Sequence, residues 1–274
     1  MTGLELNKIS EMIYERILSE EARLKMAYNE SKANIGYFYI DDLLPIEIAE
    51  SCFEVFPDSS AMRRLKSLRE YKYISAQMDK HDTILEEVIY AFQDKAVVNL
   101  IGNICNIESL FADNSLYAGG LSLMAKHNFL HPHLDNSHDS ERQRWRVLNL
   151  LYYVTPNWQR QFGGHLELWP DGPEKEPILI ESKFNRLVVM ATHDTSWHSV
   201  NKVMVDKNRC CISNYYFSDN ALRSSDKFHV TKFKGRPKDK ITNLILDVDA
   251  SLRMLIRKVF KKGLRKNPHV YKKK

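Results

Sequence analysis

The sequence predicts an α+β protein built on a double-stranded β-helix, or jelly roll, with helices packed on it. Two observations support this class. Residues 1–105 carry helical apolar patterns, whereas after Cys105 the pattern changes to short β-like runs separated by turns. Helices followed by a series of short strands are typical of proteins with a β-sandwich or barrel core.

The N-terminal part supplies the helices. Residues 4–31 have a helical period without glycine or proline, which predicts one long helix or two short ones. The aromatic, alternating residues 36–40 predict a strand. Pro45 fits the first turn of a helix over about residues 45–55, and Asp82 and Thr83 offer caps for a helix that runs to about residue 104.

The strands come next, as eight β-like runs at residues 116–125, 128–135, 145–154, 164–169, 177–180, 186–191, 198–205 and 209–217. Turn signals such as Pro156-Asn157 and Gly163-Gly164 separate them. We therefore expect one domain over residues 1–250, with a helical part at 1–105 and a jelly-roll core at 106–220.

A basic C-terminal tail differs from the rest of the chain. The net charge is +5, but residues 251–274 hold ten Lys and Arg and no acid, which leaves a body of net charge −5. An apolar stripe of helical period lies among these cations, at Leu252, Leu255, Ile256, Val259 and Phe260. The stripe could dock on the body, or the tail could be a basic amphipathic helix on a membrane surface or polyanion. We expect residues 271–274 to be frayed.

The composition is that of a soluble globular protein, with 43% apolar and 27% charged residues among 274. No apolar run approaches the roughly 20 residues of a membrane span. The acidic, helical N-terminus does not resemble a secretory or transit signal. The four cysteines, among them adjacent Cys210 and Cys211, show no disulfide spacing. We therefore expect buried free thiols and a cytoplasmic location, with Cys210 and Cys211 on opposite faces of a strand.

A histidine-rich stretch carries the strongest sign of chemistry. Residues 130–140 read LHPHLDNSHDS. On a strand, residues two apart share a face, so His133 and Asp135 point the same way. His198, from another predicted strand, would complete a set of two histidines and one carboxylate. Such a facial triad binds Fe(II) and leaves positions open, although zinc hydrolases use a similar set.

Arg209 and Tyr153 favour iron over zinc. A guanidinium grips a carboxylate with two parallel hydrogen bonds, so an arginine aimed into the barrel would suit the far end of a dicarboxylate. Tyr153 could add a hydrogen bond to the same carboxylate. A zinc hydrolase has no use for either residue.

These residues and their order resemble the Fe(II)/2-oxoglutarate-dependent dioxygenases, specifically the prolyl-hydroxylase-like branch. The resemblance extends from about residue 120 to residue 219. Its ordered elements are His133-x-Asp135, Arg146–Tyr153, Asn157-Trp158, Gly163–Trp169, Asn185–Met190, Trp197–Val200, Arg209 and Tyr215–Asp219.

The resemblance implies a role for each matched residue. His133, Asp135 and His198 would bind Fe(II), and Arg209 would bind the C5 carboxylate of 2-oxoglutarate with help from Tyr153. The implied cofactors are Fe(II), 2-oxoglutarate and O2, with ascorbate as an additional stimulant.

The chain departs from the family pattern at two places. Many relatives carry a tyrosine nine or ten residues before the first histidine, where this chain has Leu123 and Met124. Relatives also often have serine or threonine two residues after the arginine, where this chain has Cys211. Ser213, on the same face, would compensate.

The expected function is hydroxylation of an unactivated C–H bond in an amino-acid-like, prolyl or other polar substrate, with release of succinate and CO2. Arg146 and Asn149 stand where relatives contact substrate or line the pocket. The partner would be a small molecule or a peptide, and the oligomeric state stays open. Desaturation or ring closure would use the same chemistry. The alternatives are a zinc hydrolase and a non-catalytic binding protein that uses the basic tail.

Overall fold

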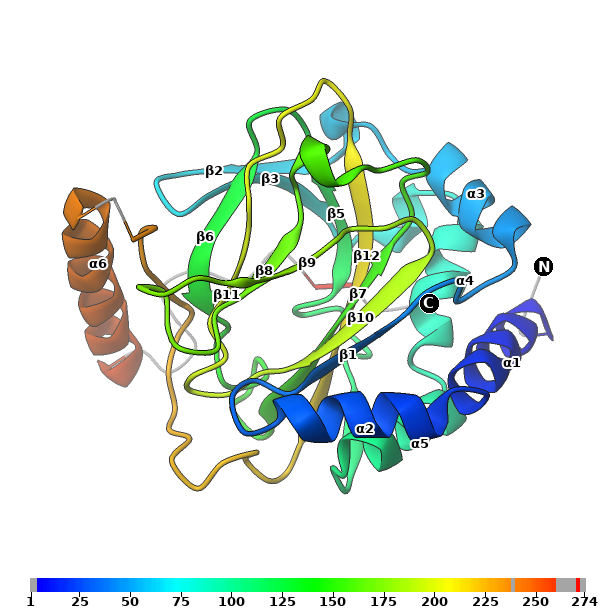
Figure 1. Cartoon of the computed structure of the whole chain (residues 1–274), viewed down its shortest axis with the longest axis horizontal. Coiled ribbons are helices and arrows are strands. Elements are labelled where there is room, and N and C mark those ends of the chain that lie inside the picture. Colours follow the sequence, from blue (N-terminus) through cyan, green and yellow to red (C-terminus); the bar gives the residue numbers. More distant parts are fainter. Residues whose placement is uncertain (1–3, 238–239, 260–269, 272–274) are drawn as a thin grey trace.

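Helices of the N-terminal part pack against a curled, antiparallel sheet in the computed structural model of the chain (Figure 1). The structure describes residues 4–237, 240–259 and 270–271. Its helices are α1 (Leu4–Leu18), α2 (Glu21–Ser31), α3 (Ile46–Glu54), α4 (Thr83–Ala91), α5 (Lys95–Cys105) and α6 (Lys240–Val259). This arrangement confirms the predicted class of a jelly roll with helices packed on it.

The strands are β1 (Tyr37–Ile40), β2 (Arg63–Lys66), β3 (Glu70–Ser75), β4 (Leu110–Ala112), β5 (Gly120–Met124), β6 (Phe129–Leu134), β7 (Trp145–Tyr153), β8 (Leu166–Leu168), β9 (Ile178–Ile180), β10 (Arg186–Ala191), β11 (His198–Val200), β12 (Arg209–Ser218) and β13 (Lys232–Phe233). The pairing order is β1-β10-β7-β12-β5-β3-β6-β11-β8-β9, and neighbouring strands run antiparallel. Each of the eight predicted β-like runs falls on one of these strands.

Alternation along β12 separates the two faces of the sheet. Cys210, Ile212 and Tyr216 belong to the main apolar core beneath the helices, whereas Arg209 and Cys211 line a cavity on the other face. The prediction that the adjacent cysteines point in opposite directions is therefore confirmed. All four cysteines are buried and free of disulfides.

The predicted helix over residues 83–104 is two helices. Asp82 caps α4 by accepting a hydrogen bond from the amide of Ile84, and Asp94 caps α5 in the same way through the amide of Ala96. The apolar period continues across the break, so periodicity alone did not reveal it. The capping aspartate interrupts the helix because its side chain competes for the first free amides.

The sequence analysis missed the hairpin of β2 and β3, together with the short strands β4 and β13. The hairpin pairs Arg63 with Ile74 and Leu65 with Lys72, and β3 then pairs with both β5 and β6. Gly120 permits this close approach, since a Cβ there would lie 2.4 Å from the carbonyl oxygen of Ser75 and its φ is +134°.

Helix α6 spans residues 240–259 and therefore crosses the expected boundary at residue 250. Leu246 and Ala250 are buried, but Leu252 and Leu255 of the predicted docking stripe are 56% and 60% exposed. Docking through these two leucines is therefore wrong. Val259 and Phe260 lie outside the side chains that the structure describes.

The expectation of a frayed C-terminal end is wrong for Tyr271. This side chain is buried, its amide donates to the Ser115 carbonyl, and its hydroxyl donates to Glu86 over 2.7 Å. Among the described helices, none is both long enough and apolar enough to cross a membrane.

Candidate metal centre

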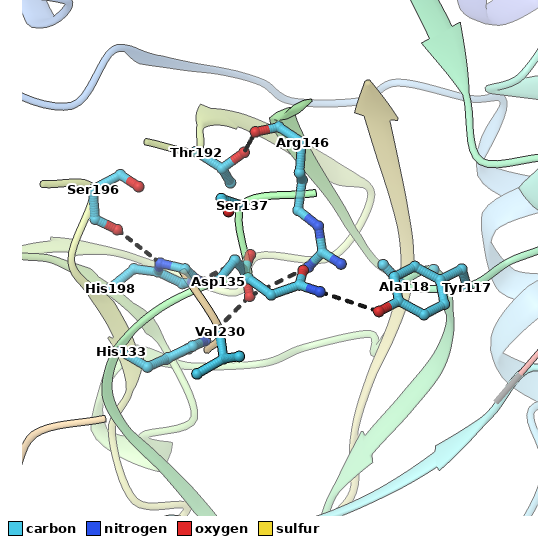
Figure 2. A network of polar contacts seen from close by, with 12 residues as sticks. Tyr117, Ala118, His133, Asp135, Ser137, Arg146, Thr192, Ser196, His198 and Val230 are labelled. Carbon is cyan, nitrogen blue, oxygen red and sulfur yellow. Dashed lines mark hydrogen bonds and ion pairs between the residues drawn. The ribbon is translucent and has the colours of Figure 1, made fainter. Parts of the chain in front are cut away.

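Three side chains of metal-ligand type meet where β6 pairs with β11. His133 on β6 is directly opposite His198 on β11, and Asp135 follows the end of β6. Nε2 of His133 lies 3.7 Å from one carboxylate oxygen of Asp135, and Nε2 of His198 lies 3.7 Å from the other. The ligand atoms of all three lie within 4.8 Å of one another. Figure 2 shows the imidazoles converging on the carboxylate.

Backbone carbonyls determine the tautomers of both histidines. Nδ1 of His133 lies 3.0 Å from the carbonyl oxygen of His131, and Nδ1 of His198 lies 3.0 Å from that of Ser196. A carbonyl oxygen can only accept, so each Nδ1 carries the proton and donates it. Each Nε2 is therefore left with a lone pair directed at the shared site, which is the arrangement of a histidine prepared to bind a metal.

Burial and local charge keep His133 and Asp135 in their metal-binding protonation states. Burial, assisted by the neighbouring His198, lowers the pKa of His133 to about 3, so the imidazole is neutral at ordinary pH. Burial opposes ionisation of Asp135, but His198 and Arg146 outweigh it and lower the pKa of that carboxyl. One oxygen of Asp135 is buried without a hydrogen-bond partner. An orphaned carboxylate oxygen beside two free imidazole lone pairs fits a divalent cation.

Arg146 stands behind the carboxylate. Its guanidinium is 3.7 Å from Asp135 and lies 4.5 Å from the ring centre of Tyr215. A register shift against β12, where Leu148 pairs with Tyr216 and Arg146 with Phe217, turns Arg146 to this face. Arg146 lines a small cavity beside Asp135 and does not line the cavity that both histidines share with Asp135, so its position favours orienting Asp135 over touching a substrate.

The three residues open into a cavity of about 340 Å³ whose wall also contains Arg209. Arg209 is only 4% exposed. No carboxylate of the described residues forms an ion pair with it; its guanidinium donates to the sulfur of Met124 and lies 5.3 Å from the ring centre of Tyr153. A buried guanidinium without a carboxylate costs free energy unless a ligand supplies one.

The remaining predicted site residues lie in the same cavity. Tyr153, Ser213 and Asn149 all line it. The amide oxygen of Asn149 is buried without a partner, whereas the hydroxyl of Ser213 donates to the carbonyl of Gly120. At the position where relatives carry tyrosine, Met124 lines the cavity and Leu123 belongs to the core.

Three polar cavity residues were not singled out from the sequence. Arg63 and Lys72 come from the missed β2–β3 hairpin, and Tyr117 comes from the loop before β5. Tyr215 of β12 also lines the cavity, and the sequence placed it in a motif without assigning it a role. The hydroxyl of Tyr117 accepts a hydrogen bond from the side-chain amide of Asn136. The alternation of Tyr71, Tyr73 and their neighbours was the available signal for β3.

Comparison with known proteins agrees with this geometry. Residues 119–217, which contain the three ligand-type residues and Arg209, match the family model described as the 2OG-Fe(II) oxygenase superfamily. This segment is a 2OG-Fe(II) oxygenase domain. The cofactors of the family are Fe(II), 2-oxoglutarate and O2, and the histidine–aspartate–histidine set of the oxygenase domain fits the metal.

Individual relatives of the oxygenase domain are prolyl hydroxylases. The chain is 29% identical over 96 residues to prolyl 3-hydroxylase OGFOD1 of Mus musculus. The aligned segment covers 33% of this chain but only 17% of that protein. The chain thus spans about a sixth of the length of this curated relative.

Two solved structures share the fold. A Pseudomonas putida prolyl-4-hydroxylase superposes with a TM-score of 0.53 at 16% identity and covers 71% of this chain and 98% of that one. A Trichoplax adhaerens prolyl hydroxylase, solved with a peptide of the hypoxia inducible factor, also superposes with a TM-score of 0.53, at 19% identity. The match covers 76% of this chain and 96% of that one.

Proposed function

We propose that the protein is an Fe(II)- and 2-oxoglutarate-dependent dioxygenase that hydroxylates an unactivated C–H bond of a prolyl, amino-acid-like or other polar substrate. The substrate would be a small molecule or a peptide. One observation carries the proposal: the three ligand-type residues and an unpaired, buried Arg209 line one cavity. A zinc hydrolase or a simple binding protein accounts for only one part of that arrangement.

The residues divide the work between metal and co-substrate. His133, Asp135 and His198 would hold Fe(II). Arg209 would hold the C5 carboxylate of 2-oxoglutarate, with Tyr153 beside it, and Asn149 would offer its unpartnered amide oxygen to a donor group of a bound ligand. When bound, iron and 2-oxoglutarate would supply the oxidising power, with release of succinate and CO2.

The protein's own part is to position the metal and the co-substrate and to exclude water from the cavity. The tautomers of His133 and His198 are set before the metal arrives, so little reorganisation is needed on binding. Burial of the phenol raises the pKa of Tyr153, so its hydroxyl stays protonated and able to donate to a carboxylate. The apolar walls from Leu130, Leu166 and Val200 limit water in the cavity.

An anaerobic titration tests the proposal. Fe(II) and then 2-oxoglutarate are added to metal-free protein, and the visible metal-to-ligand charge-transfer band is followed. We expect the band in wild type and in His127→Asn, and its loss in Asp135→Ala. His127 is exposed with a positive φ that asparagine tolerates, so it serves as the matched control. Tight zinc binding without any 2-oxoglutarate response would instead favour the hydrolase.

Two further expectations remain proposals. The buried free cysteines support a reducing compartment such as the cytoplasm. Exposed apolar side chains on α6, namely Ile245, Val248, Leu252 and Leu255, support a peripheral contact of the basic tail with an anionic membrane surface or polyanion. Cosedimentation with anionic lipid vesicles tests the second expectation.

A further inference from the structure

One wall of the cavity is cationic. The hairpin of β2 and β3 turns one face toward the cavity, with Arg63 and Leu65 on β2 and Lys72 and Ile74 on β3. The alternate residues of the hairpin, including Arg64 and Lys66, do not line it. Two cations on this one wall therefore face the space where a substrate would lie.

The known parts of the site do not use these cations. Asp135 is the one acidic residue among the described residues that line the cavity, and it already faces the two histidines and Arg146. Under the proposed function, the charges of Fe(II), Asp135, Arg209 and 2-oxoglutarate balance one another. Arg63 then remains as an uncompensated cation of the cavity wall, beside Lys72, whose carboxylate partner Glu70 does not line the cavity.

The local partners of the two cations differ. Lys72 is half-buried and forms an ion pair of 3.1 Å with Glu70, whose side chain does not line the cavity. It lies close enough to the metal site to act electrostatically on both His133 and Asp135. Arg63 is exposed, and no carboxylate of the described residues pairs with it. An arginine at a cavity mouth with a free guanidinium suits the planar oxygens of a carboxylate or phosphate.

We infer that the substrate presents an anionic group, a carboxylate or a phosphate, to Arg63 and Lys72 while its reacting C–H bond lies over the metal site. This inference rests on the proposed function and adds the substrate class. Two contacts hold the hairpin where it can meet such a group. Strand β3 pairs with the first residues of β6, the strand that also carries His133, and Arg69 at the hairpin forms an ion pair with Asp249 of α6.

A binding experiment with inorganic phosphate tests the inference without knowledge of the substrate. Mn(II) replaces Fe(II), with protein in excess, and saturating 2-oxoglutarate occupies Arg209. The ³¹P relaxation rate of added phosphate is then measured, because paramagnetic enhancement falls steeply with distance from the metal. Acetate, followed through its methyl protons, is the matching carboxylate probe, and the tighter of the two identifies the preferred anion.

We expect saturable enhancement in wild type that persists with 2-oxoglutarate bound. The double variant Arg63→Gln/Lys72→Met should bind the anion about tenfold more weakly. The matched double variant Arg64→Gln/Lys66→Met removes the same charge from the opposite face of the hairpin and should bind like wild type. Circular dichroism confirms that each variant is folded.

Three results would overturn the inference. The first is that wild type shows no enhancement of anion relaxation. The second is that both double variants lose anion affinity equally. The third is an enhancement that 2-oxoglutarate abolishes, which would place the anion at Arg209. In each of these cases Mn(II) and 2-oxoglutarate still bind and the proposed function stands. If they do not bind, the proposed function itself has failed.

Discussion

At the scale of single residues, the site combines groups that are prepared and groups that are unsatisfied. His133 and His198 are prepared to bind a metal. The protonated Nδ1 of each donates a hydrogen bond to a backbone carbonyl, which leaves Nε2 free. Asp135 and Arg209 are unsatisfied, because each has a buried polar atom without a hydrogen-bond partner. Unsatisfied buried groups reduce stability and are retained where a ligand completes them.

Arg209→Met should therefore separate stability from binding. Removing an unpaired buried cation while keeping an apolar chain of similar length should raise the ligand-free stability by ~1 kcal/mol or leave it unchanged. The same change should abolish most of the thermal stabilisation that 2-oxoglutarate gives to the metal-loaded wild type. Thermal unfolding with and without 2-oxoglutarate measures both effects. A loss of ligand-free stability with unchanged 2-oxoglutarate binding would mean that Arg209 is a structural residue.

At the scale of elements, α6 shows how burial decides which face of a helix docks. Leu246 and Ala250 are buried against the body, and the sulfur of Met254 accepts a hydrogen bond from the amide of Val230. Arg253 adds hydrogen bonds to Asp249 and to the carbonyl of Thr231. The more apolar stripe that contains Leu252 and Leu255 faces solvent instead.

A pair of glutamate substitutions tests this orientation. Ala250→Glu places a charge in a buried position and should weaken docking of α6 by about 2 kcal/mol or more. Leu252→Glu lies on the exposed face and should stay within ~0.5 kcal/mol of wild type. Trypsin cleavage at Arg253 under native conditions reports local opening, so it should accelerate more than ~10-fold in Ala250→Glu alone. Equal acceleration in both variants would contradict the docked face.

At the scale of the whole molecule, ion pairs join the sheet to the segment that follows β1. The carboxylate of Asp41 accepts two hydrogen bonds from Arg186 on β10, of 2.5 and 3.0 Å, and one of 3.0 Å from Lys183. Its backbone carbonyl also accepts from Arg16 of α1. Partial burial opposes ionisation, but the hydrogen bonds from Arg186 and Lys183 outweigh it and lower the Asp41 pKa.

The depressed pKa gives this contact a defined pH dependence. The stabilisation is fully present above the unfolded-state value of ~3.9 and is lost as pH falls through the lower folded-state value. Asp41→Asn should cost about 1 kcal/mol at pH 7 and almost nothing near pH 2. Urea unfolding at both pH values measures the difference. A cost that stays the same at both would mean that the charge of Asp41 contributes nothing.

Local pattern was enough to predict much of this architecture. The eight predicted β-like runs each fall on a strand, because two-residue alternation and turn chemistry are local properties. The same alternation placed His133 and Asp135 on one face, and the motif order pointed to His198, Arg209 and Tyr153. All five line one cavity.

Tertiary structure alone decided the features that depend on distant partners. The β2–β3 hairpin is defined by its pairing with β5 and β6, so its cations could not be placed in the cavity from local sequence. The face of α6 that docks and the anchoring of Tyr271 likewise depend on surfaces formed by other elements. The sequence by itself predicted the candidate metal site, since side-chain type and spacing carry that signal. Only the folded chain decided what surrounds that site, because burial and charge there come from residues far apart in sequence.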